Sequence, residues 1–216
     1  MTRLFKLFTI VLGLALVALP AQAYEKGDWI VRAGVGMVSP ESTAYTDPAE
    51  DLRISVDDGT SAVISATYMF SPNFGFEILA AWPFTHDIKA GPADGSASIK
   101  IAETKHLPPT FTFQYQFAPE ATFRPYAGLG LNYTTFFDEK LDQTLFPDTS
   151  IKIDDSFGLA VQLGADFKIN EQWMLNFDIR YIDIAPDATL TDDTGSDTIG
   201  IDINPMVYSV NLAFVF

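Results

Sequence analysis

Hydrophobic and polar residues alternate with a period of two along most of the chain after residue 28. In "FTFQYQF" (111–117) the aromatic residues occupy odd positions, and Thr or Gln occupies the even ones. The same alternation runs through "SFGLAVQLGADFKI" (156–169) and "WMLNFDIRYI" (173–182). A period of two is typical of β-strands, because successive side chains point to opposite faces.

The strand-like runs and their connections follow a regular arrangement. Eight runs are expected, at 29–38, 61–70, 75–84, 106–117, 125–137, 155–169, 173–182 and 205–216. Three connections are short, at 71–75, 118–123 and 170–172, and four are long, at 39–60, 87–105, 138–155 and 186–204. Short turns at one end and long loops at the other are typical of outer-membrane proteins. The pattern predicts an all-β fold, an eight-stranded antiparallel up-and-down transmembrane β-barrel with four long extracellular loops.

The distribution of charge predicts which face of the barrel meets lipid. The chain has 13 basic and 28 acidic residues, and most of the acidic ones lie in the four long loops. The strands carry few charges, and their apolar face is too bulky to fill an eight-stranded interior. We therefore expect the Phe, Leu and Tyr face to contact hydrocarbon. Aromatic residues near strand ends are expected to form interfacial girdles: Trp29, Trp82, Trp173, Tyr68 and Tyr208.

The N-terminus has the features of a secretory signal peptide. Arg3 and Lys6 precede the apolar run "LFTIVLGLALVAL" (7–19), and "PAQA" (20–23) places small residues at the spacing that signal peptidase accepts. The apolar run is too short for a membrane-spanning helix. We expect residues 1–23 to be the signal peptide and residues 24–216 the outer-membrane barrel.

The composition argues against several classes of function. Cys is absent, so thiolate catalysis and Cys-based metal sites are not possible. The net charge of −15 disfavours nucleic acid as a partner. His86 and His106 flank the second long loop, but a metal site would need ligands beyond Asp87, and no nucleophile motif surrounds either histidine. We expect no enzyme activity, no metal site and no cofactor.

Ionisable residues on the small-residue face are candidates for a plug inside the barrel: Arg32, Glu77, Asp166, Lys168, Asp178 and Arg180. Polar filling for stability is favoured over an ion-conducting path. An eight-stranded barrel is too narrow for a wide aqueous pore.

Three prolines lie near the outer ends of the third and fourth strands. Pro83, Pro108 and Pro109 cannot donate to a β-ladder, and proline is normally kept to edges or bulges. One hypothesis is a partly unzipped seam that gives an apolar solute a side exit. The alternative is that the strand simply ends there and bends into the loop.

Three segments resemble the outer membrane protein W family, which includes barrels associated with alkane uptake: "HLPPT" (106–110), "FRPYAGLGLNYTTFFDE" (123–139) and "INEQWMLNFDIRYIDI" (169–184). The resemblance implies a monomeric barrel in the Gram-negative outer membrane that passes small hydrophobic molecules. It also implies a funnel formed by the long loops and the upper barrel, with lateral release into the bilayer. It implies further that Leu79 lines an apolar constriction. Arg180 stands where some members carry a bulky aromatic residue, which implies a more polar lower plug. The terminal Phe216 resembles the signal read by the outer-membrane assembly machinery.

Two functions remain open from the sequence. The first is passive uptake of small hydrophobic molecules. The second is a structural or surface-interaction barrel, similar to a receptor or adhesin, with a plugged lumen and loops that meet a host, phage or envelope partner. Membrane lipid and lipopolysaccharide are expected partners in both cases. The acidic loops could bind divalent cations that bridge lipopolysaccharide, although a solvated anionic rim is favoured because "DDTGSD" (192–197) lacks the spacing of a calcium loop.

Overall fold

The computed structural model describes residues 23–41 and 43–216. The expected signal peptide therefore lies outside the described residues, apart from Ala23. Within the described part of the chain, no helix is long and apolar enough to cross a membrane.

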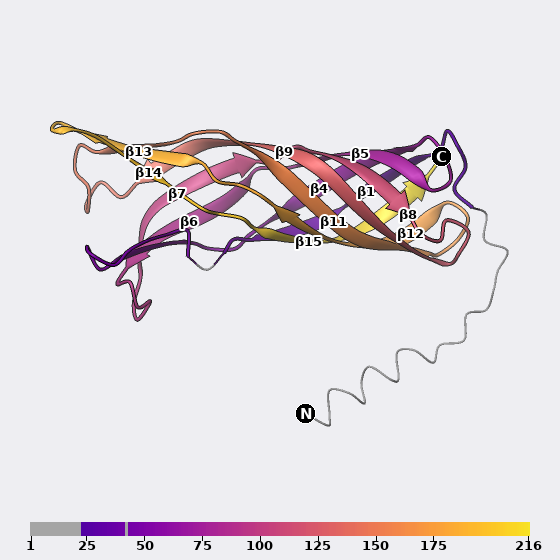
Figure 1. Ribbon diagram of the computed structural model, residues 1–216, viewed down its shortest axis with the longest axis horizontal. Coiled ribbons are helices and arrows are strands. Elements are labelled where there is room, and N and C mark those ends of the chain that lie inside the picture. Colours follow the sequence, from indigo (N-terminus) through magenta and orange to yellow (C-terminus); the bar gives the residue numbers. More distant parts are fainter. Residues whose placement is uncertain (1–22, 42) are drawn as a thin grey trace, which may run out of the picture.

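Eight antiparallel strands close into a barrel, seen side-on in Figure 1. They are β1 (Trp29–Ser39), β4 (Gly59–Met69), β5 (Phe74–Ala81), β8 (Thr110–Gln116), β9 (Phe123–Leu141), β11 (Ser156–Lys168), β12 (Trp173–Ile182) and β15 (Met206–Val215). Each strand pairs with its neighbours along the chain, and β15 pairs with β1 to close the ring. The predicted fold class is confirmed.

The four long connections contain β structure that extends the barrel wall. Strand β9 is 19 residues long and continues from the barrel into this extension. Its outer part adjoins a sheet ordered β9-β7-β6-β3-β2, and a separate sheet is ordered β10-β13-β14. The added strands are β2 (Tyr45–Asp47), β3 (Leu52–Val56), β6 (Phe84–Gly91), β7 (Ile99–Leu107), β10 (Ser150–Ile153), β13 (Asp187–Asp192) and β14 (Gly195–Gly200). We call these seven strands with the outer part of β9 the extracellular extension; they form the left half of Figure 1.

Along each barrel strand, successive side chains point alternately to the outer face and to the interior, as the sequence predicts. Leu129 and Phe157 are 69% and 68% exposed on the outer face, whereas Gln114 and Asp166 are fully buried inside. Apolar residues so exposed are acceptable when hydrocarbon surrounds them, provided that the closed ring satisfies the backbone groups. The apolar face therefore points outward, and the polar face fills the interior.

One side chain lies on the opposite face from its predicted one. The alternation Phe76, Ile78, Ala80 and Trp82 predicts that Phe84 also points outward, but Phe84 is only 1% exposed. Pro83 lies between β5 and β6 and interrupts the strand there. The alternation restarts in the opposite phase after this break, and β6 therefore turns Phe84, His86 and Ile88 inward.

Candidate functional site

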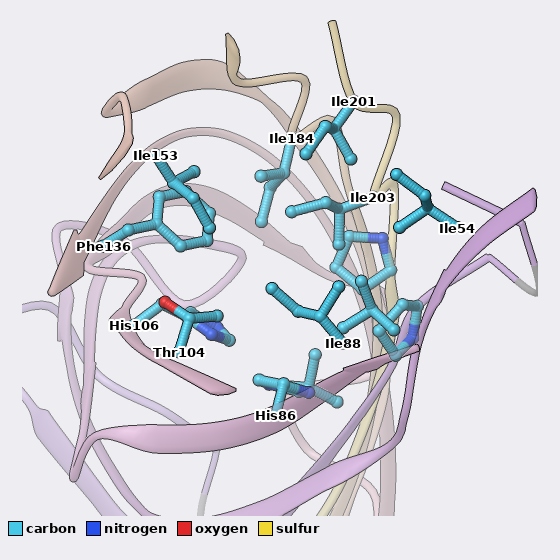
Figure 2. A pocket seen from close by; sticks show the side chains of 14 residues that line it. Ile54, His86, Ile88, Thr104, His106, Phe136, Ile153, Ile184, Ile201 and Ile203 are labelled. Atoms are coloured by element: carbon cyan, nitrogen blue, oxygen red, sulfur yellow. The ribbon is translucent and has the colours of Figure 1, made fainter. Parts of the chain in front are cut away.

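The extracellular half of the molecule encloses a narrow apolar cavity, which we call the funnel. Its volume is about 30 Å³, so it holds few atoms as it stands. Ten of the lining side chains are labelled in Figure 2, and they point toward a common centre. The full lining is Val38, Pro40, Ile54, Val56, His86, Ile88, Thr104, His106, Phe136, Ile153, Ile184, Ile201, Ile203 and Pro205.

The isoleucines of the funnel come from segments that the sequence suggests are polar loops. Ile54 lies on β3, Ile88 on β6 and Ile153 on β10, while Ile201 and Ile203 follow β14. Their buried side chains hold the extracellular extension together as one hydrophobic cluster. The resemblance implied a funnel formed by the long loops and the upper barrel, but sequence reasoning assigned none of the lining residues to it. The available signal was the alternation of isoleucine with polar residues in "TIGIDIN" (198–204).

Leu79 marks the lower boundary of this cluster. Its side chain points inward, is half-buried and packs against the apolar cluster. Two residues earlier on the same face, Glu77 is fully buried and belongs to a polar network. Leu79 is not among the residues that line the funnel cavity itself.

Below Leu79, charged side chains cross the lumen in a network centred on Arg32. Its Nη2 lies 2.6 Å from Asp166 Oδ2, and its Nε donates to Asp166 Oδ1 at 3.1 Å. Its Nη1 donates to Thr67 at 2.8 Å and lies 3.4 Å from Glu77 Oε2. These contacts join β1, β4, β5 and β11 across the interior.

Arg180 completes the network from β12. Its Nη2 lies 2.5 Å from Glu77 Oε1, and its Nε lies 2.8 Å from Asp178 Oδ1. Gln162 donates from Nε2 to Asp178 at 2.5 Å and to Glu77 at 3.3 Å. All of these side chains are almost fully buried, so this polar plug blocks a straight path along the barrel axis.

The plug differs from the predicted set in two ways. Lys168 points inward nearer the periplasmic end, but its buried Nζ has no hydrogen-bond partner and forms no ion pair with a described residue. Two tyrosines were missed: Tyr126 donates to Asp178 at 2.8 Å, and Tyr24 donates to Asp166 at 2.9 Å. A lone Tyr on the inward face carries no sequence signal that distinguishes it from ordinary filling.

The proline residues coincide with a gap in the barrel ladder, which we call the seam. The pairing of β5 with β8 ends at Leu79↔Thr110, and the pairing of β6 with β7 begins at Phe84↔His106. Between them no backbone pairing joins residues 80–83 to residues 107–109, all of which the structure describes. The backbone pairing of residues 107–109 with their other neighbour, β9, is intact at this level, because Tyr133 N donates to Pro109 O at 3.1 Å.

Pro108 is the residue that prevents the ladder from continuing. In an antiparallel strand, alternate residues direct their backbone groups to opposite neighbours. Since Pro109 O faces β9, the backbone of Pro108 faces β5, where the register would place Ala81. Proline has no N–H to donate there. The Pro108 carbonyl is instead satisfied by the Thr110 hydroxyl at 3.0 Å.

Two histidines lie in the funnel wall directly above the seam. The rings of His86 and His106 stack with centroids 4.8 Å apart, and His106 also stacks on Phe84 at 5.4 Å. His86 Nδ1 lies 2.6 Å from Asp57 O, and the ring packs closely against Gly59, where a Cβ would lie 2.5 Å from its Cε1. The Nε2 atoms of both histidines are buried without a hydrogen-bond partner among the described residues.

Burial keeps both rings neutral. The outer faces of β6 and β7 carry half-exposed ion pairs such as Lys100–Asp87, so this level lies outside the hydrocarbon. Desolvation lowers the pKa of His86, and the nearby carboxylates of Asp57, Asp58 and Asp87 oppose the effect. Desolvation and the neighbouring His86 lower the pKa of His106 to about 3. Among the described residues, no group of three or more ligating side chains could hold a metal ion.

The outer surface carries the expected aromatic residues. Trp29, Tyr68 and Trp173 are exposed at the end that holds the short turns, and Trp82 is exposed beside the seam. Phe216 is 70% exposed at the same end as the short turns, where its ring lies 4.8 Å from that of Phe214.

Comparison with known proteins identifies the family to which this barrel belongs. Residues 25–216 match the OmpW family. The chain is 39% identical to Outer membrane protein W of Vibrio cholerae, over 94% of both chains, and 25% identical to Outer membrane protein AlkL of Ectopseudomonas oleovorans, over 89% of this chain and 84% of that one. The crystal structure of the outer membrane protein OprG from Pseudomonas aeruginosa superposes with a TM-score of 0.81 at 34% identity, covering 91% of this chain and 99% of that one. The protein is therefore a β-barrel of the Gram-negative outer membrane and belongs to the OmpW family.

Proposed function

We propose that this barrel takes up small hydrophobic molecules passively and releases them sideways into the outer membrane. The observation that carries the proposal is the apolar funnel, which lies directly above a polar plug and beside a gap in the barrel wall. A solute that enters from outside finds apolar walls down to Leu79. Family membership supports a role in outer-membrane transport.

The plug makes an axial route unfavourable for an apolar solute. To pass, the solute would have to separate buried ion pairs between Arg32, Arg180 and their carboxylate partners. Leaving one member of a buried pair without its partner costs about 3–5 kcal/mol. The seam, by contrast, has no backbone hydrogen bonds to break. The least costly exit is therefore lateral, between residues 80–83 and 107–109, into the lipid that surrounds the barrel.

Closing the seam tests the lateral route. Pro108→Thr restores an N–H where the register places Ala81 O, so we expect the β5–β8 ladder to lengthen and uptake to slow. The measurement is the initial rate at which proteoliposomes that contain the purified barrel take up a fluorescent hydrophobic solute. A rate equal to that of the unmodified protein would remove the lateral route.

Pro125→Thr is the matched control. Pro125 is also a proline of a barrel strand, but it lies within the continuous strand β9, opposite Ala165 and away from the seam. We expect it to leave the uptake rate unchanged. Both variants should retain the heat-dependent shift in gel mobility that reports a folded barrel.

The projecting extracellular extension also suits the alternative, a surface-interaction barrel with a plugged lumen. The uptake assay separates the two functions, because only the transport function predicts a flux above that of protein-free liposomes.

A further inference from the structure

The polar atoms in the funnel are gathered on one wall. Apart from Thr104, His86 and His106, every lining side chain is apolar. These three residues lie on the adjacent strands β6 and β7, and Figure 2 shows their side chains turned toward the isoleucines that line the rest of the cavity. A molecule in the funnel would meet polar groups on this wall alone.

The hydrogen bond from His86 to Asp57 determines which nitrogen of this wall is a donor and which is an acceptor for one of the two histidines. The carbonyl oxygen of Asp57 can only accept, so the Nδ1 of His86 carries the proton. The Nε2 of the neutral His86 ring is then an acceptor without a donor. The Nε2 of His106, also buried and unpartnered, can donate or accept according to its tautomer. The stacked pair therefore offers one acceptor and one adaptable atom.

We propose that the His86–His106 pair recognises the hydroxyl group of an uncharged amphipathic solute whose apolar body occupies the funnel. A hydroxyl group donates and accepts, so it matches both unpartnered nitrogens. A carboxylate fits poorly, because Asp57, Asp58 and Asp87 lie beside His86 and the rest of the wall is apolar. This inference rests on the proposed function and narrows its substrate class to long-chain alcohols over plain hydrocarbons.

The position of the pair also suits release through the seam. Phe84↔His106 is the first backbone pair above the gap. A solute held there by its hydroxyl group could move its apolar body from the funnel to residues 80–83 and 107–109 without leaving the pair. It would leave with the body in hydrocarbon and the hydroxyl group still near the interface, which is the orientation an alcohol takes in a bilayer.

The test compares 1-octanol with octane on the full barrel in lipid nanodiscs. The chain has 2 His, so the 15N signals of both rings can be assigned in histidine-labelled protein. Isoleucine methyl signals of the funnel report binding of either compound, and empty nanodiscs correct for partition into lipid. We expect octanol to bind at least about tenfold more tightly than octane, because its hydroxyl group adds two hydrogen bonds of modest net strength. Octanol alone should shift the Nε2 resonances.

His106→Phe keeps an aromatic ring in the stack but removes one of the two unpartnered nitrogens, and it should reduce the preference while octane still binds. Thr104→Val is the control, because it removes another polar atom of the funnel without touching the pair, and it should keep the preference. Equal affinities in the unmodified protein, or a preference that is undiminished in His106→Phe, would overturn the inference while leaving uptake intact. If His106→Phe does not fold, the comparison of octanol with octane in the unmodified protein decides. Absence of flux for both compounds would instead refute the proposed function.

Discussion

Arg32 shows how a single side chain can hold a narrow barrel together. It is 2% exposed and contacts Asp166, Glu77 and Thr67 on three other strands. A buried guanidinium is stable only when its donors are satisfied, and here carboxylate and hydroxyl oxygens satisfy them. The plug is therefore a single cooperative unit, in which the loss of one member leaves the others uncompensated.

Removing Arg32 tests that cooperativity. Arg32→Met keeps most of the side-chain volume but leaves Asp166 and Glu77 facing one fewer positive charge. We expect the free energy of unfolding to fall by about 3–5 kcal/mol, measured by urea denaturation of the barrel in liposomes.

Lys152→Met is the control for charge removal. Lys152 pairs with Asp154 on the surface, where both side chains are more than half exposed, so we expect little change. Adding Asp166→Asn to Arg32→Met should recover part of the loss, because it removes an uncompensated buried charge. A loss for Arg32→Met no larger than that for Lys152→Met would show that the plug does not stabilise the barrel.

At the level of the elements, the sequence predicts the barrel strands better than the extension. Alternation such as that in "FTFQYQF" (111–117) is strong because every second side chain contacts lipid. Strands β13 and β14 are largely exposed on both faces, so their residues carry no comparable alternation of apolar and polar side chains. The pairs that define them, such as Leu190↔Asp197, depend on the turn and on contacts with β10.

The candidate site also contains some features that the sequence predicts and others that it does not. Pro83, Pro108 and Pro109 predicted a break in the ladder, because proline lacks the N–H that a ladder requires, but they left open whether the break is a side exit or the end of a strand. The ionisable residues of the plug were predictable because they occupy the alternate strand positions that point into the barrel. The family resemblance implied a funnel, but its isoleucines were not predictable, because they come from four separate connections and converge only when the extracellular extension has formed.

The stability of the extracellular extension should depend on pH through its histidines. Burial lowers the pKa of His86 and His106 below the ordinary value near 6.5, so the unfolded extension binds more protons than the folded one below that pH. Stability is then fully present above about pH 7 and falls as the pH decreases from about 6.5 toward 4.5.

Hydrogen exchange of the amides of β6 and β7, corrected for intrinsic rates, measures this dependence. His86→Phe combined with His106→Phe should flatten the profile between pH 6.5 and 4.5, whereas the amides of β12 should show no such slope in either protein. An unchanged slope in the double variant would assign the effect to the carboxylates of the rim instead.

Viewed as a whole, the molecule combines a lower barrel filled by a polar plug with an upper part that encloses a narrow apolar cavity. The plug closes the periplasmic half, the extracellular extension carries the apolar funnel above the membrane, and the seam lies at the junction of the two. The outward face of apolar side chains places the seam in contact with lipid. Under the proposed function, a hydrophobic molecule would use this arrangement to cross the polar surface of the cell without crossing the barrel.

A reversible lock on the seam tests the lateral route most directly. The chain has no Cys, so Ala80→Cys with Pro109→Cys introduces one pair across the gap, at the position where the register would set the two residues opposite each other. Uptake of a hydrophobic solute by proteoliposomes is measured with the same protein oxidised and then reduced, and mass spectrometry determines the fraction that is cross-linked. The account predicts that oxidation stops uptake and that reduction restores it. Undiminished uptake by the fully cross-linked protein would contradict it.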